Sequence, residues 1–350
     1  MTKRRTGAIW AAGIAAGIGA GVVAERILMR RTLGRPDPER DVELGTLPGE
    51  PLTVTSFDGT ELHARVVGPA EAPAVVFAHG ITLDLTLWHY QWRALSDRYR
   101  CVLYDQRGHG RSGTSPKDDY SVEALAGDLR AILDATSPEG PAVLVGHSMG
   151  GMSIVSLADR HPEEFGGRVA GVVLVDTTAS DIVREVAGEL GVRVERLIRP
   201  ARRWFLSDLK RVDRIRRRVQ TTGSDFAYLA TRMSNFGPNA SPAQVEHVAR
   251  IATEAKPEVW AHTLGSLIEM DLRHAIERVT VPTLVIVGDR DRLTPKTSAQ
   301  ALLKALPDGR GIVLTGAGHL SMMERHETFN RRLEAFLDEV LSRARMAAAR

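Results

Sequence analysis

The most informative run in this 350-residue sequence is Ala142-Val143-Leu144-Val145-Gly146-His147-Ser148-Met149-Gly150-Gly151. Its first four residues are apolar and predict a strand buried on both faces of a sheet, while a helix-like stretch begins at Met149. Gly146 and Gly150 flank Ser148, so the chain can turn sharply from strand to helix and leave the serine hydroxyl projecting above the sheet. A Gly-x-Ser-x-Gly match alone is weak, but its position between strand and helix predicts a nucleophile. The alternative is a tight turn that carries an inert serine.

Apolar runs of the same kind recur along the chain. We predict strands over residues 52–56, 61–67, 74–78, 101–104, 142–145, 169–175, 283–287 and 312–314. The Asp58-Gly59 pair predicts a hairpin turn between the first two strands. Helix-like stretches over 122–136, 149–160 and 295–306 separate later strands. This alternation predicts an α/β fold, an eight-stranded and mostly parallel sheet with helices on both faces.

One interval breaks the alternation of strands and helices. Residues 177–278 contain no buried-strand run and are rich in arginine, which predicts a helical lid inserted after the sixth strand. Apolar residues between 204 and 219 fall at helical spacing among arginines and lysines. This pattern predicts an amphipathic helix that packs on the core, faces an acyl chain or rests on an anionic membrane. The core then comprises residues 52–176 and 279–345.

The N-terminal segment, residues 1–34, has a different character. An uncharged run over 7–24 follows three basic residues at 3–5 and is long enough for a short membrane-spanning helix. Three interpretations compete: an uncleaved anchor with an exported body, a cleaved signal peptide that leaves a secreted body, and an apolar helix packed on the body. In a membrane, self-association could use a face formed by Gly13, Gly17 and Gly21. Residues 35–51, rich in proline, glycine and charge, predict a linker.

The composition, with 43% hydrophobic and 25% charged residues, is that of a soluble globular protein. Part of the net charge of +3 is concentrated at the N-terminus and in the lid. Neither cluster carries a nucleic-acid-binding motif, so we expect no nucleic-acid partner. Cys101 is the only cysteine, which excludes an intrachain disulfide and a cysteine-based zinc site.

A serine hydroxyl becomes a good nucleophile only when a base takes its proton and an acid orients that base. His319 lies just past the last predicted strand, where a loop at the carboxyl edge of the sheet can reach Ser148. Two carboxylates, Asp289 and Asp291, follow the seventh predicted strand. We choose Asp291 as the acid because it lies farther out in the loop. A third candidate, Asp176, ends the sixth predicted strand.

The developing oxyanion needs two backbone N–H donors, one after the nucleophile and one in the loop after the third strand. These would be the N–H groups of Met149 and Ile81. Ile81 follows His79 and Gly80, and the glycine lets the backbone approach a substrate closely. We expect His79 to order this loop and not to act as a base, because it precedes the serine in the chain and His319 is better placed.

Several of these motifs occur in a fixed order. They are His79-Gly80, Asp105-Gln106-Arg107-Gly108-His109-Gly110-Arg111-Ser112, the turn at 146–151, Gly288-Asp289-Arg290-Asp291 and Gly318-His319. The ordered set resembles the α/β-hydrolase superfamily, in its serine esterase and lipase-like branch, over about residues 52–341 apart from the lid. In particular, the chain is similar to membrane-anchored α/β-fold hydrolases of actinobacteria.

This resemblance implies the α/β-hydrolase fold and a triad of Ser148, Asp291 and His319, with Ile81 and Met149 as oxyanion donors. It also implies that the loop over 105–112 is structural. Dehalogenases and epoxide hydrolases of the superfamily carry an aspartate in place of the serine, so the resemblance implies acyl transfer.

We therefore expect a carboxylic-ester hydrolase that acts on an apolar or lipid-like small-molecule ester through an acyl-serine intermediate. No metal or organic cofactor is expected. The same triad could instead serve a lactonase, a C–C hydrolase or a cofactor-free perhydrolase. A protein of another class, a binding module without catalytic activity, is the more distant alternative.

Overall fold

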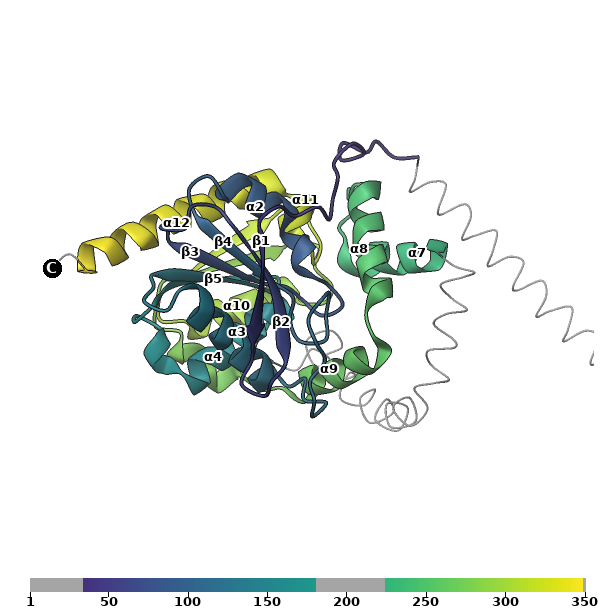
Figure 1. The fold of residues 1–350 in the computed structure, drawn as a ribbon. Helices are drawn as coiled ribbons and strands as arrows, with labels where there is room; N and C mark the ends of the chain where they lie inside the picture. The colour runs from purple at the N-terminus through teal and green to yellow at the C-terminus, as the bar shows by residue number, and fades with distance from the viewer. Residues whose placement is uncertain (1–33, 181–223, 349–350) are drawn as a thin grey trace, which may run out of the picture.

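The protein is described by a computed structural model over residues 34–180 and 224–348 (Figure 1). The three glycines of the predicted self-association face and the helix predicted over 204–219 lie outside these residues. Within the two described ranges, none of the helices combines the length and the apolar character needed to cross a membrane.

The core is a single eight-stranded sheet. Its strands are β1 (Glu50–Thr55), β2 (Glu61–Val67), β3 (Ala74–Ala78), β4 (Arg100–Tyr104), β5 (Ala142–His147), β6 (Val169–Val175), β7 (Thr283–Gly288) and β8 (Gly309–Leu314). They lie in the order β1-β2-β4-β3-β5-β6-β7-β8. β2 pairs antiparallel with β1 and β4, and all other neighbours are parallel. The predicted sheet is confirmed. β8 begins before the predicted residue 312 because Gly309, Arg310 and Gly311 pair with β7 without being apolar.

Helices cover both faces of the sheet (Figure 1). On one side lie α2 (His89–Leu95) and α12 (His326–Ala348), and on the other lie α3 (Val122–Thr136), α4 (Met149–Arg160) and α10 (Lys296–Ala305). The short elements are η1 (Leu85–Trp88), η2 (Pro162–Glu164), η3 (Arg273–Arg278) and α11 (Ser321–Glu324).

Alternation along the buried strands builds two apolar layers. In β3, Val76 and Ala78 join the layer under α3 and α4, whereas Val75 and Phe77 join the layer under α2 and α12. Successive side chains of a strand point to opposite faces, so a continuous apolar run packs against helices on both sides. This explains why the sequences of the central strands β3 and β6 are apolar throughout.

Between β6 and β7 the described chain forms three further helices, α7 (Ser224–Asn235), α8 (Pro242–Glu254) and α9 (Pro257–Glu269), at the position of the predicted lid. Figure 1 shows α7 and α8 beside the sheet. The residues after α7 contact the loop after β8: the Gly237 N–H donates to the Glu324 carboxylate at 2.9 Å, and the Gly318 N–H donates to the same carboxylate at 2.6 Å. The inserted helices therefore touch the chain next to His319.

The described part of the predicted linker is attached to the body. Asp37 accepts hydrogen bonds from the Ser241 hydroxyl and the Ala243 N–H at the start of α8. Glu39 accepts from the Tyr90 hydroxyl at 2.9 Å and lies 3.1 Å from His326 Nε2. Three apolar side chains of the segment also pack on the core: Val42, Leu44 and Leu47. A composition rich in proline and charge did not reveal these contacts.

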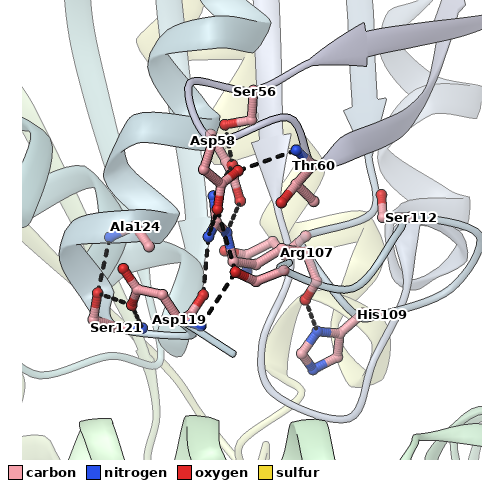
Figure 2. Close-up of polar contacts among 12 residues, drawn as sticks. Ser56, Asp58, Thr60, Arg107, His109, Ser112, Asp119, Ser121 and Ala124 are labelled. Atoms are coloured by element: carbon pink, nitrogen blue, oxygen red, sulfur yellow. Dashed lines mark hydrogen bonds and ion pairs between the residues drawn. The ribbon is translucent and has the colours of Figure 1, made fainter. Parts of the chain in front are cut away.

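The loop between β4 and α3 contains the fully buried Arg107, around which the polar contacts of Figure 2 are arranged. Its guanidinium donates to both carboxylate oxygens of Asp128 at 2.7 Å and to Asp58 at 2.9 Å. The Ser56 hydroxyl donates to Asp128 as well. We call Ser56, Asp58, Arg107 and Asp128 the arginine cluster. It joins the β1–β2 hairpin to α3, a structural role for this loop.

Candidate active site

Ser148 occupies the turn between β5 and α4. Its φ of 50° and ψ of −117° are a conformation that costs a residue other than glycine of order 1–3 kcal/mol. A Cβ at Gly150 would lie 2.2 Å from the Ala78 carbonyl oxygen, and a Cβ at Gly146 would lie 2.5 Å from the Gly150 carbonyl oxygen. Both positions therefore require glycine. The geometry is that of a nucleophile elbow.

The loop after β3 lies against this elbow. A Cβ at Gly80 would lie only 3.2 Å from the Ser148 Cβ. The next residue, Ile81, is half-buried and packs against the core. Met149 is the first residue of α4, where backbone N–H groups have no acceptor within the helix. The backbone thus borders Ser148 at Gly80 on one side and at Met149 on the other.

His79 is buried in the same loop. Its Nδ1 donates to the Gly80 carbonyl at 2.7 Å, and its Nε2 accepts the Gln106 N–H at 3.0 Å. Burial, together with the neighbouring His109, lowers the pKa of His79 to about 3. The ring is therefore neutral, and its two nitrogens join the backbone of this loop to the backbone of the loop after β4.

A buried pair forms between the loops after β7 and β8. The His319 Nδ1 donates to Asp291 Oδ2 at 2.8 Å. The other oxygen, Oδ1, accepts the N–H groups of Leu293 and Thr294 at 2.8 and 3.0 Å. The Thr294 hydroxyl donates to Oδ2 at 2.8 Å and lies 3.2 Å from His319 Nδ1. The carboxylate is thus fully engaged and fixes the orientation of the imidazole.

The charges of this pair shift both pKa values. Burial lowers the pKa of His319, but the Asp291 carboxylate outweighs burial, so the net pKa lies above the usual 6.5. Burial raises the pKa of Asp291, but His319 and the hydrogen bonds from Thr294 outweigh it and hold this pKa below its usual value. The arrangement therefore favours an ionised Asp291 and an imidazole that gains a proton readily.

The other two candidate acids contact backbone groups. Asp289 accepts the Gly316 N–H at 2.6 Å and so joins the loops after β7 and β8. Asp176 accepts the N–H groups of Gly288 and Ser321 at 2.8 and 3.0 Å. Among the described residues, Asp291 is the carboxylate that hydrogen-bonds to His319.

The elbow is also tied directly to the His319 loop. His147, fully buried beside Ser148, donates from Nε2 to the His319 carbonyl at 2.8 Å. The centroids of the two imidazole rings are 4.8 Å apart. The His319 loop thus contacts the elbow although 171 positions separate His319 from Ser148 along the chain.

The described contacts of the His319 side chain are with Asp291 and Thr294, and a hydrogen bond from the Ser148 hydroxyl is not among them. Such bonds often shorten only when substrate binds. Proton transfer from Ser148 to His319 therefore belongs to the proposed mechanism.

Two residues of the site were missed in the sequence. Thr294 follows Asp291 by three positions in a loop that ends at Pro295, and this Asp-x-x-Thr spacing is a signal for a side-chain-capped turn. His147 carries no such signal, because its hydrogen-bond partner lies 172 residues away.

A strained serine between strand and helix, with a buried histidine and aspartate at the same sheet edge, is the arrangement expected of an α/β hydrolase. Comparison with known proteins agrees. The family model described as alpha/beta hydrolase fold matches residues 73–326, and the chain belongs to this family. It is accordingly a hydrolase.

Individual relatives extend the comparison. The chain is 31% identical over 287 residues to 3-oxoadipate enol-lactonase 2 of Acinetobacter baylyi, a match that covers 81% of this chain and 96% of the relative. The crystal structure of the enol-lactonase from Burkholderia xenovorans is similar with a TM-score of 0.65 and 28% identity, covering 82% of this chain and 100% of that one. A thermophilic esterase from Thermogutta terrifontis has a TM-score of 0.65 and 25% identity, covering 83% and 99%.

Proposed function

We propose that this hydrolase cleaves carboxylic esters through an acyl-Ser148 intermediate, with Ser148, His319 and Asp291 as its triad. The observation that carries the proposal is the 2.8 Å hydrogen bond between His319 and Asp291, in loops that contact the elbow of Ser148. A neutral imidazole held in this tautomer, with Nδ1 protonated, leaves Nε2 free to accept a proton.

In the first half of the reaction, Ser148 Oγ attacks the ester carbonyl carbon and His319 Nε2 takes the hydroxyl proton. Asp291 stabilises the imidazolium that forms. The carbonyl oxygen becomes an oxyanion, which the backbone N–H groups of Ile81 and Met149 would bind. Collapse of the tetrahedral intermediate breaks the bond to the alcohol oxygen, and His319 returns its proton to the leaving alcohol.

In the second half, water replaces the alcohol. His319 takes a proton from the water as it attacks the acyl carbon, and Ser148 Oγ leaves with that proton. The products are the free acid and the regenerated serine.

For the substrate, we propose an apolar or lipid-like ester. Support comes from Met233 on α7, which is 58% exposed. The Met233 carbonyl accepts a hydrogen bond from Arg292, the residue after Asp291, so the end of α7 lies at the acid loop. Exposed apolar side chains near a reactive group favour an apolar substrate.

A lactone is the second candidate, because the enol-lactonase relative shares 31% identity with this chain. A lactone is a cyclic ester and needs the same triad. Relative kcat/KM values on a panel of acyclic p-nitrophenyl esters and simple lactones distinguish the two, since a lactonase would prefer the ring.

The test of the triad is replacement of the nucleophile. Purified protein is expected to hydrolyse short p-nitrophenyl esters, and Ser148→Ala is expected to lower kcat by about 10³–10⁶-fold. A fluorophosphonate probe should label the wild type at Ser148 and leave the variant unlabelled. Retained ester hydrolysis in Ser148→Ala would refute the triad, and an unlabelled, inactive wild type would favour a binding module.

We also propose that residues 1–34 attach the enzyme to a membrane, with the body exported, on the basis of their apolar run alone. Probe labelling of membrane and soluble fractions tests this. Label confined to the soluble fraction would contradict the anchor.

A further inference from the structure

The end of β6 lies between the elements that carry the proposed triad. β6 pairs with β5 on one side, where Val175 faces His147, and with β7 on the other, where Val175 faces Ile286. The main chain extends both pairings: the Ser148 N–H donates to the Val175 carbonyl at 3.0 Å, and the Asp176 N–H donates to the Ile286 carbonyl at 2.9 Å. The next two side chains, Asp176 and Thr177, are therefore at the centre of the site.

Thr177 contacts the nucleophile's own backbone. Its hydroxyl donates to the Ser148 carbonyl at 2.6 Å, and the side chain is buried. It also fills the space beside Gly151, where an added Cβ would lie 2.7 Å from the Thr177 hydroxyl. Thr177 thus fixes the first turn of α4 against the end of β6.

Asp176 contacts the other two loops. One carboxylate oxygen accepts the Gly288 N–H at 2.8 Å, three residues before Asp291. The other accepts the Ser321 N–H at 3.0 Å, two residues after His319. A single buried side chain thereby joins the acid loop to the base loop.

This position is energetically costly. Asp176 has a φ of 43°, in the left-handed region, which residues other than glycine adopt uncommonly. Its carboxylate is completely buried, and both burial and the nearby Asp291 raise its pKa to about 8. Its described hydrogen-bond partners are backbone N–H groups of the two loops. Such a cost is expected where a residue serves the site more than the stability of the fold.

We propose that Asp176 and Thr177 are positioning residues that hold the Ser148 turn, the Asp291 loop and the His319 loop at fixed separations. This inference rests on the proposed function, because it concerns the geometry of the same triad. A displacement of about 1 Å in a reacting group can cost about 10²-fold in rate, so small losses of alignment are measurable.

Three variants test the inference. Asp176→Asn keeps the size of the side chain and tolerates a left-handed φ, but it replaces one acceptor oxygen with an NH₂ that faces an N–H donor. Thr177→Val keeps the shape and removes the hydroxyl, and Thr177→Ser restores the hydroxyl. We expect Asp176→Asn and Thr177→Val to lower kcat by about 10- to 100-fold with KM changed less than about threefold. Thr177→Ser should recover most of this loss.

The matched control is Asp128→Asn, which alters an equally buried carboxylate in the arginine cluster. It should keep the wild-type kcat once folded. The inference is overturned if Asp176→Asn and Thr177→Val keep the wild-type kcat, if Thr177→Ser is no better than Thr177→Val, or if Asp128→Asn loses as much. Should Asp176→Asn not fold, the two Thr177 variants decide the outcome alone.

Failure of the proposed function is recognised separately, in the wild type. An inactive wild type whose Ser148 does not react with a fluorophosphonate would overturn the proposed function and this inference with it. An active, labelled wild type with unaffected Asp176 and Thr177 variants would overturn only the inference.

Discussion

Two pairs of aspartates with buried side chains occur in the described fold, and the two pairs differ in the basic side chain that faces them. In the arginine cluster, Asp58 and Asp128 share the guanidinium of Arg107. At the proposed active site, Asp176 and Asp291 lie near the imidazole of His319; we call these three residues the histidine cluster.

The difference lies in whether the basic side chain can change its charge near neutral pH. A guanidinium stays charged at any physiological pH, so the arginine cluster is a permanent link between the β1–β2 hairpin and α3. An imidazole changes charge near neutral pH. The histidine cluster can therefore pass a proton, and it gives up part of the stability that a permanent charge would supply.

The largest expected effect comes from making the same substitution in both clusters. Asp291→Asn removes the charge and the acceptor that orient His319, and kcat should fall by about 10⁴-fold. Asp128→Asn should leave kcat of the folded enzyme unchanged and lower the free energy of unfolding by about 3–5 kcal/mol. Steady-state kinetics and urea denaturation of both variants measure this. If Asp291→Asn and Asp128→Asn lowered kcat by similar factors, the proposed difference between a catalytic histidine cluster and a structural arginine cluster would be wrong.

A smaller effect is expected from changing the cation of the arginine cluster. Arg107→Ala leaves Asp58 and Asp128 buried without their partner, and the free energy of unfolding should fall by about 3–5 kcal/mol. Arg107→Lys keeps the charge but not the planar fork and should lose less. Denaturation curves give both values. An Arg107→Ala variant as stable as the wild type would show that the cluster adds no stability.

The smallest expected effect is the pH dependence of kcat/KM, which should fall about tenfold for each pH unit below the pKa of His319. The base must be neutral to accept a proton, and the pKa of His319 is raised above 6.5 by Asp291 after burial is offset. We expect kcat/KM to fall as pH drops through this raised value. Asp291→Asn should move the acidic limb to lower pH, whereas Asp128→Asn should leave it in place. If Asp291→Asn left the acidic limb of the pH profile unchanged, the assignment of His319 as the base paired with Asp291 would be wrong.

The sign of the accompanying stability change is opposite to that of activity. Because folding raises the pKa of His319, the protonated pair stabilises the fold fully below pH 6.5, and this contribution is lost as pH rises through the folded pKa. The arginine cluster should show no matching loss in this range, since Arg107 keeps its proton.

The sheet could be predicted from the sequence because its evidence is local. Runs such as β3 and β6 are apolar throughout, and two-sided burial of a parallel sheet requires this. The elbow could also be predicted, because its motif is contiguous in the sequence and Gly146 is fixed by the Gly150 carbonyl four residues later; the contact that fixes Gly150, with Ala78 of β3, is not local.

Long-range contacts could not be predicted in the same way. Asp176 was considered only as an alternative acid, because its partners, Gly288 and Ser321, lie 112 and 145 residues away. The composition of residues 35–51 predicts a linker. The contacts that attach this segment to the body could not be recognised, because the partners of Asp37 and Glu39 are on α8, α2 and α12, far away in the sequence. The amino-acid composition of a segment gives no information about the distant residues that the segment contacts in the folded protein.

A structure of the enzyme after reaction with a fluorophosphonate tests the proposed triad most directly. We expect a phosphonyl group on Ser148 Oγ, one phosphonyl oxygen within hydrogen-bond distance of the Ile81 and Met149 N–H groups, and His319 Nε2 within hydrogen-bond distance of Ser148 Oγ. An unmodified Ser148, or an imidazole that stays out of reach of the modified serine, would contradict it.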